Sequence, residues 1–324
     1  MTGPDPRVSV VIATNRGGPW LDEAVASVLA QTMDDLELII VDDGVPGGVR
    51  QLAALDDRIR LVAGRQAGIS MARNIGNAAA RGELVAVLDD DDRWMPDKLE
   101  RQLALLDRHP ESAMCHTQFE RIDADGVVIG PGWATPTGQD ALTTGTLGVA
   151  HSTTIWRRDV VMAVGGYDPT RRLAEDLDLL LKVLRWWSIC FDPGVLAQYR
   201  VHDENASTRY RDQWDDAHRT LLDHLEIAAA GRRSRTRLPP RSPLVVKRVR
   251  HAYVPVAAEQ LRLHLRDHRW RSALDDVVWM YGTAPLDATR LLIGKTITAM
   301  GRTRRANPVS GTDEVRATEA DARP

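Results

Sequence analysis

Apolar and polar positions along the first hundred residues alternate between two periods. Val8–Ala13 and Leu36–Val41 are short, continuous apolar runs rich in β-branched residues, the pattern of strands that are covered on both faces. Between them, Leu21, Val25 and Val28 follow the i, i+4, i+7 spacing of one helix face. The order strand, helix, strand predicts an open parallel sheet, in which ligands bind at the carboxyl ends of the strands.

The same two patterns continue to about Asn205. The predicted elements, in chain order, are a strand Ile59–Val62, a helix Ile69–Arg81, a strand Leu84–Leu88, a helix Pro96–Arg108, strands Ala113–Phe119 and Val127–Ile129, a helix Leu173–Trp187 and a strand Val195–Tyr199. Asp125-Gly126 is a turn signal between two of these strands, so we expect an antiparallel pair. The predicted fold is therefore α/β with a mixed, mainly parallel sheet.

The rest of the chain is predicted to be mainly helical. The candidate helices are Trp214–Ala229, Val246–Arg266 and Trp270–Tyr281. Arg232–Arg241 is basic and contains two prolines, which is typical of an exposed linker. The polar, acidic tail over residues 306–324 is predicted to be disordered.

Composition excludes several classes of protein. The 324 residues carry 42 Lys and Arg against 45 Asp and Glu, a formal charge of −3, so no overall basic field indicates a nucleic-acid partner. The two cysteines, Cys115 and Cys190, have no metal-type spacing and support neither a disulfide framework nor a zinc site. The small number of cysteines fits a protein of a reducing compartment.

We also expect a cytoplasmic protein without a transmembrane span. The sequence has no apolar stretch near 18 residues and does not begin with a basic segment followed by an apolar run and a cleavage site. Arg290–Arg305 mixes apolar and basic residues, which leaves peripheral contact with the inner face of the membrane open. A helix packed on the protein is the commoner explanation of such a stretch.

Polar residues follow three of the predicted strands at the point where each strand ends. These segments are Thr14–Arg16, Asp42–Gly44 and the four aspartates Asp89–Asp92. Carboxylates this close raise one another's proton affinity unless a cation is supplied, and oxygen ligands select Mg²⁺ or Mn²⁺. The alternative is a solvated acidic turn or helix cap, but the position at the end of a buried strand favours a metal site.

Several motifs now stand in a recognisable order, and together they resemble the family 2 glycosyltransferases, which use nucleotide sugars and have the GT-A fold. The resemblance runs from about Val8 to Ser207. The motifs are VSVVIATNR at Val8–Arg16, VDDG at Val41–Gly44, GISMARNIG at Gly68–Gly76, LDDDDRWMPDKLE at Leu88–Glu100, GGYDP at Gly165–Pro169, AEDLDLLLK at Ala174–Lys182 and YRVH at Tyr199–His202. Each alone is weak, whereas the ordered set is specific.

The resemblance implies a set of donor-site residues. Thr14, Asp42 and Asp43 would line the pocket for the base and ribose, and Arg73 would lie near the nucleotide. Asp89 and Asp90 would lie beside the ribose and the metal.

It also implies a metal site and a catalytic pair. Asp91 matches the second aspartate of the family's D-x-D motif, although ligation by Asp89 or Asp92 stays an alternative, and His202 would approach the metal or the diphosphate. Glu175-Asp176 matches the acidic pair near the acceptor, with Asp176 as the catalytic base. Ordinary charge at a helix N-terminus is the plainer explanation of that pair.

The activity that the resemblance implies is an inverting, single transfer of a sugar to an acceptor hydroxyl. The donor would be a UDP- or dTDP-linked sugar with Mn²⁺ or Mg²⁺, and residues 1–110, 111–207 and 208–305 would form a nucleotide-binding half, an acceptor half and a helical C-terminal region. Val45–Gly48 departs from the family pattern, and Lys182-Val183-Leu184-Arg185-Trp186 lacks the glutamine of processive synthases. A sugar nucleotidylyltransferase and a catalytically silent nucleotide-sugar-binding scaffold are the rival hypotheses.

Overall fold

The computed structural model describes residues 5–136, 148–205, 209–230, 261, 264–265 and 268–283. The chain divides into two compact units, Met1–Val256 and Ala257–Pro324. The second unit contains helix α9 (Trp270–Thr283), where Asp276 Oδ2 lies 2.6 Å from His264 Nδ1. All other elements described below belong to the first unit.

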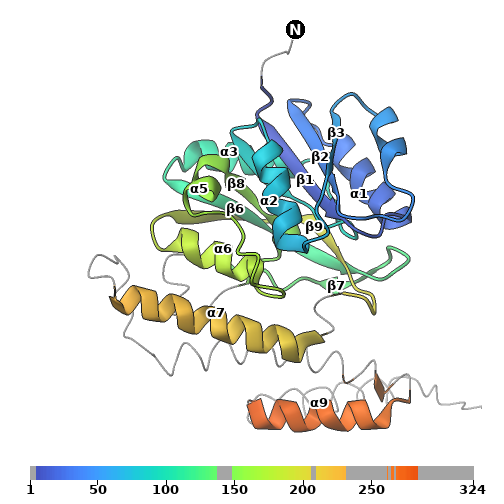
Figure 1. Ribbon diagram of the computed structural model, residues 1–324, viewed down its shortest axis with the longest axis vertical. Helices are drawn as coiled ribbons and strands as arrows, with labels where there is room; N and C mark the ends of the chain where they lie inside the picture. Colours follow the sequence, from blue (N-terminus) through green and yellow to red (C-terminus); the bar gives the residue numbers. More distant parts are fainter. Residues whose placement is uncertain are drawn as a thin grey trace, which may run out of the picture. The chain divides into compact units, whose positions relative to one another are not determined.

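Four parallel strands form one half of the sheet, which has nine strands among the described residues (Figure 1). Their spatial order is β3 (Ile59–Ala63), β2 (Leu36–Asp42), β1 (Val8–Thr14) and β4 (Leu84–Val87). Every residue of β1 is buried, as its unbroken apolar run predicts. Because β1 and β2 are in parallel register, both end at the same edge of the sheet.

The other half of the sheet is mixed. Strand β8 (Ile155–Arg157) joins β4 to β6 (Ser112–Ile122) through two antiparallel pairings, and β9 (Ser188–Arg200) then runs parallel to β6. The two-residue strand β5 (Arg93–Trp94) pairs with β9. Strand β7 (Val128–Pro131) pairs antiparallel with β6.

Helices cover both faces of the sheet. On one face, α1 (Pro19–Leu29) and α3 (Lys98–Arg108) bury apolar side chains in the same cluster as alternate residues of β1. On the other face, α2 (Ile69–Ala79) approaches so closely that a Cβ on Gly76 would lie 2.4 Å from Val11 Cγ1. Only glycine fits at this contact.

The remaining helices among the described residues of this unit are shorter or lie later in the chain. They are the 3-10 turns η1 (Arg50–Ala54) and η2 (His151–Thr153), and the α-helices α5 (Arg158–Ala163), α6 (Glu175–Leu184) and α7 (Tyr210–Ala230). Helix α6 contacts β9 and α7, so α7 is part of the unit that contains the sheet.

The fold class predicted from the sequence is confirmed. The pattern missed β5, β8 and α5, which are two, three and six residues long and too short to establish a period. The predicted linker, Arg290–Arg305, the tail and most of the predicted helix Val246–Arg266 lie outside the described residues. None of the helices in the described part of the chain has the length and hydropathy that crossing a bilayer requires.

Candidate active site

The aspartate run lies directly after β4, at the edge where β1 also ends. Thr14, the last residue of β1, donates a hydrogen bond from Oγ1 to Asp90 Oδ2 at 2.6 Å. Arg16 binds both Asp90 and Asp91, with 2.7 Å to Asp91 Oδ2. The predicted meeting of polar strand ends is therefore present between β1 and β4.

The three buried aspartates, Asp90 to Asp92, have different partners and different proton affinities. Burial raises the pKa of Asp90, and it raises the pKa of Asp92 far more because the charges of Asp91 and Asp89 add to it. For Asp91, burial is outweighed by hydrogen bonds with His202 and Arg16, which hold its pKa below the ordinary value. Asp91 is therefore the aspartate of the buried three that keeps its charge most readily.

Asp92 is a structural member of the run. Its carboxylate accepts hydrogen bonds from Ser152 Oγ at 2.5 Å and from the backbone N–H of Arg200 at 2.8 Å, and its side chain is almost fully buried. Ser152 Oγ also accepts the backbone N–H of Asp89 at 3.2 Å. These contacts fix the turn that presents the other aspartates, and they engage both carboxylate oxygens of Asp92.

His202, which lies just beyond the end of β9, contacts Asp91. Its Nε2 is 3.0 Å from Asp91 Oδ2, and its ring packs against Trp20 with 4.4 Å between centroids. Arg200, fully buried, donates from Nε to the Asp91 carbonyl oxygen at 2.8 Å and from Nη2 to Glu23 at 2.5 Å. The YRVH motif thus supplies both a histidine in contact with Asp91 and an arginine that supports the aspartate run.

Arg73 connects the aspartate run to the acidic pair. This arginine is 5% exposed on α2, and it donates to Asp89 Oδ1 at 2.5 Å and to Glu175 Oε1 at 2.7 Å. The predicted proximity to the nucleotide stays a prediction. What the sequence did not indicate is that two carboxylates 86 positions apart share one guanidinium.

Glu175 and Asp176 are the first two residues of α6. Burial raises the pKa of Glu175 to about 7, against the opposing effect of Arg73, and burial likewise raises the pKa of Asp176. Asp176 is partly buried and accepts a hydrogen bond from the backbone N–H of Leu177 at 2.7 Å. Among the described residues, no side chain donates a hydrogen bond to Asp176, so its carboxylate is available to another donor.

Asp42 ends β2 at the same edge of the sheet and Asp43 follows it, but both carboxylates accept local hydrogen bonds. Asp42 Oδ1 accepts the backbone N–H groups of Gly44 and Val45 at 3.1 and 2.9 Å. Asp43 Oδ1 accepts those of the two residues that follow Gly64, at 3.0 and 2.6 Å. Both carboxylates therefore shape the loops that border the site, and each keeps a second oxygen for a ligand.

Sequence reasoning missed Arg16, Ser152 and Arg200 as members of the site. Arg16 and Arg200 do lie inside motifs that were recognised, next to Thr14 and His202. A cationic residue beside a run of acidic strand ends is the signal that could have found them, because the four carboxylates need compensation. Ser152 offered no such signal.

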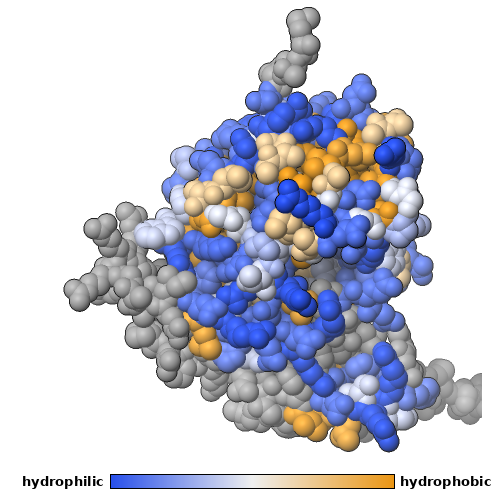
Figure 2. All heavy atoms as spheres, in the orientation of Figure 1, coloured by the Kyte–Doolittle hydropathy of each residue, from blue (hydrophilic) through white to orange (hydrophobic). Residues whose placement is uncertain are grey.

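A buried histidine lies close to the Arg73 bridge, because the ring of its partner Tyr167 has the Arg73 guanidinium 5.6 Å from its centroid. His151 is buried with its Nε2 2.7 Å from the hydroxyl of Tyr167, and burial lowers its pKa well below the ordinary value. Trp156 is 1% exposed and belongs to the core, whereas Trp133 and Trp186 are about half exposed. The surface over α6, in the view of Figure 1, is mostly hydrophilic (Figure 2).

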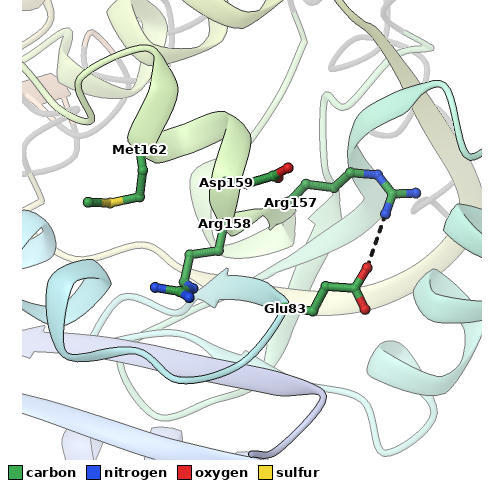
Figure 3. Close-up of a pocket in the computed structure, with 5 residues that line it drawn as sticks. All are labelled: Glu83, Arg157, Arg158, Asp159 and Met162. Carbon is green, nitrogen blue, oxygen red and sulfur yellow. Dashed lines mark hydrogen bonds and ion pairs between the residues drawn. The ribbon is translucent and has the colours of Figure 1, made fainter.

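A separate cavity of about 470 Å³ lies at the opposite end of β4 (Figure 3). Glu83, which precedes β4, and Arg157 to Asp159 at the start of α5 line it together with Met162. Arg157 pairs with Glu83 there at 3.5 Å, and Arg158 and Asp159 add one charge of each sign, so the lining has no net charge. This cavity takes no part in the site at the carboxyl ends of the strands.

The donor set at Asp91 and His202 fits a divalent cation. A carboxylate oxygen and an imidazole nitrogen are ligands that Mn²⁺ accepts, and Mg²⁺ normally takes only one or two protein carboxylates with phosphate oxygens and water completing its shell. Among the described residues, no group of three or more His, Cys, Asp or Glu side chains could hold a metal. A cation here would accordingly depend on the ligand's own oxygens.

Comparison with known proteins agrees with this geometry. The model of glycosyl transferase family 2 matches residues 9–165. A putative teichuronic acid biosynthesis glycosyltransferase, TuaG of Bacillus subtilis, is 30% identical over 236 residues, which cover 70% of this chain and 90% of TuaG. The chain belongs to glycosyltransferase family 2.

Other relatives are longer or more distant. An uncharacterised glycosyltransferase of Rickettsia felis is 28% identical over 214 residues, covering 63% of this chain. This chain spans 36%, 21% and 31% of three longer rickettsial relatives.

Two solved structures share the GT-A fold of this family 2 chain. They are the mannosyltransferase PcManGT from Pyrobaculum calidifontis in complex with GDP-Man and Mn²⁺, with a TM-score of 0.55 and 19% identity, and S. aureus TarS 1-349 in complex with UDP, with 0.51 and 14%. The match with PcManGT covers 93% of this chain and 83% of PcManGT. The match with TarS 1-349 covers 89% of this chain and 92% of the TarS chain.

Proposed function

We propose that this glycosyltransferase moves one sugar from a nucleoside-diphosphate donor to an acceptor hydroxyl with inversion at the anomeric carbon. The observation that carries the proposal is the Arg73 bridge, in which one buried guanidinium binds Asp89 and Glu175. The bridge supports the proposal because it joins the carboxylate that we assign to the donor side, Asp89, to the one that we assign to the acceptor side, Glu175. Nothing in a solvated acidic turn or an ordinary helix terminus would require such a bridge.

In the proposed reaction, Asp176 takes the proton of the acceptor hydroxyl as the acceptor oxygen bonds to the anomeric carbon. The bond from that carbon to the diphosphate oxygen breaks on the opposite face, and the nucleoside diphosphate leaves with the electron pair. Burial raises the pKa of Asp176 toward neutrality, where a general base is most effective. Its carboxylate also lacks a side-chain donor among the described residues.

The other residues of the site would hold the donor. Thr14, Asp42 and Asp43 would border the base and ribose, with Asp90 beside them. Asp91 and His202 would hold Mn²⁺ or Mg²⁺, which when bound offsets charge on the departing diphosphate, an effect worth several kcal/mol. Solved structures of related fold contain UDP, UDP-GlcNAc or GDP-Man, so the donor panel should include UDP-, dTDP- and GDP-linked sugars.

Asp176→Asn tests the proposal directly. Donors are first screened for Mn²⁺-dependent thermal stabilisation, and nucleoside diphosphate release is then measured with the donor that binds. We expect Asp176→Asn to lower turnover by about 10²–10⁴-fold, the usual contribution of a positioned base, with donor binding retained. Asp159→Asn is the matched control, because Asp159 also accepts the N–H of the next residue in the first turn of a helix, at 2.8 Å.

Near-normal turnover of Asp176→Asn would contradict the assignment of the base. Pyrophosphate release from a nucleoside triphosphate and a sugar phosphate would instead support a nucleotidylyltransferase. Donor binding without any release, in the presence of an acceptor mixture, would support the silent scaffold.

A further inference from the structure

The residues just before the acidic pair are hydrogen-bonded to α7. Helix α6 begins at Glu175 without a side-chain cap, because the preceding residue is Ala174. Ordinarily a polar side chain at that position would accept one of the unpaired N–H groups and fix the direction of the chain. Instead, a side chain of another helix accepts the N–H groups of the two residues that come just before Ala174.

Asp216 on α7 is that acceptor. Its Oδ2 accepts the backbone N–H of Leu173 at 3.0 Å and that of Arg172 at 3.2 Å, although 43 and 44 positions separate them in the sequence. Asp216 is 8% exposed and its Oδ1 lies 3.5 Å from Arg219 Nη2, so the carboxylate faces these two amides and one arginine. The two amides come directly before Ala174 and the acidic pair.

A second contact fixes the position of α7 along α6. His224 Nε2 lies 2.8 Å from Asp178 Oδ1, and Lys182 Nζ lies 2.7 Å from the other oxygen of the same carboxylate. Asp178 is 3% exposed and His224 is 7% exposed. Since α7 is anchored along α6 by this buried group, Asp216 acts from a fixed support.

We propose that Asp216 is a positioning residue that sets the location of Asp176 relative to the bound donor. The inference rests on the proposed function, since it assumes that Asp176 is the base. Asp176 is the second residue of α6, three positions after Leu173, so a shift of the chain at Leu173 is transmitted to its carboxylate. A misplacement of about 1 Å at a reacting group can cost about 10²-fold in rate.

The test compares Asp216→Ala with Asp216→Asn, which keeps an oxygen acceptor for the two amides. Asp215→Ala is the matched control, because Asp215 is the exposed neighbour on the same helix. We expect Asp216→Ala to lower kcat by about 10–100-fold with donor dissociation constant and circular dichroism unchanged. Asp216→Asn should recover most of the loss, and Asp215→Ala should behave as the unmodified protein.

The double variant Asp176→Asn with Asp216→Ala separates this inference from the proposed function. If Asp216 acts through Asp176, the double variant has the kcat of Asp176→Asn alone. Independent, multiplying losses would overturn the positioning role, as would an unchanged kcat in Asp216→Ala or a loss confined to donor binding. Full turnover of Asp176→Asn by itself would reject the base assignment instead, whatever Asp216→Ala does.

Discussion

Replacing Arg73 by methionine tests the contact that brings the two halves of the site together. Arg73 and Glu175 are both less than a tenth exposed and are joined by a 2.7 Å contact. Methionine keeps much of the volume of the side chain but leaves the Glu175 carboxylate without its cation. The partner Asp89 is less affected, because its side chain is 30% exposed and water can replace the arginine.

The loss of folding stability caused by Arg73→Met depends on pH. A buried carboxylate stripped of its partner costs about 3–5 kcal/mol if it stays ionised, so Glu175 in the variant takes up a proton instead. In the unmodified protein the pKa of Glu175 is about 7, raised by burial, and it releases its proton above that pH. From there upward the variant holds one more proton in its folded state and loses about 1.4 kcal/mol of relative stability per pH unit.

Urea unfolding at pH 6 and at pH 8.5 measures this difference. We expect Arg73→Met to lose about 2 kcal/mol more at pH 8.5 than at pH 6 relative to the unmodified protein. The double variant Arg73→Met with Glu175→Gln cannot titrate at this position, so its deficit should not grow with pH. Because the unmodified protein releases its own Glu175 proton near pH 7, the deficit of the double variant should instead shrink by about 1.4 kcal/mol from pH 6 to pH 8.5. A deficit of Arg73→Met that does not change with pH would refute the buried ion pair as the link between the two segments.

Two further predictions concern other charged groups. Lys98 is fully buried, and burial lowers its pKa to about 7. Between pH 7 and 10 the unfolded chain therefore binds one more proton than the folded protein, so the free energy of unfolding in urea should rise with pH over that range. Lys98→Met should remove this rise. Asp91→Asn should weaken Mn²⁺ binding at least about tenfold in an electron paramagnetic resonance titration with donor nucleotide, since the negative charge of the proposed ligand is lost. Unchanged Mn²⁺ affinity would exclude Asp91 as a ligand, with Asp159→Asn as the control.

The parts of the fold that the sequence predicted are those with local periodicity. The unbroken apolar run of β1 and the i, i+4 spacing of α1 each specify an element, because burial acts on neighbouring positions of one chain segment. Strands β5 and β8 depend on pairing with β9, β4 and β6, and two or three residues contain no period from which to predict them.

For the site, the sequence by itself determined which chemical groups are present and the order in which they occur: acidic strand ends, an acidic pair and a histidine. Only the tertiary structure decided how these groups are paired. Arg73 binds Glu175 across 102 positions, His202 lies on Asp91 across 111, and Asp216 accepts the Leu173 amide across 43. Charge and hydrogen-bond partners are chosen by distance in space and by exclusion of water, and neither quantity can be read from separation along the chain.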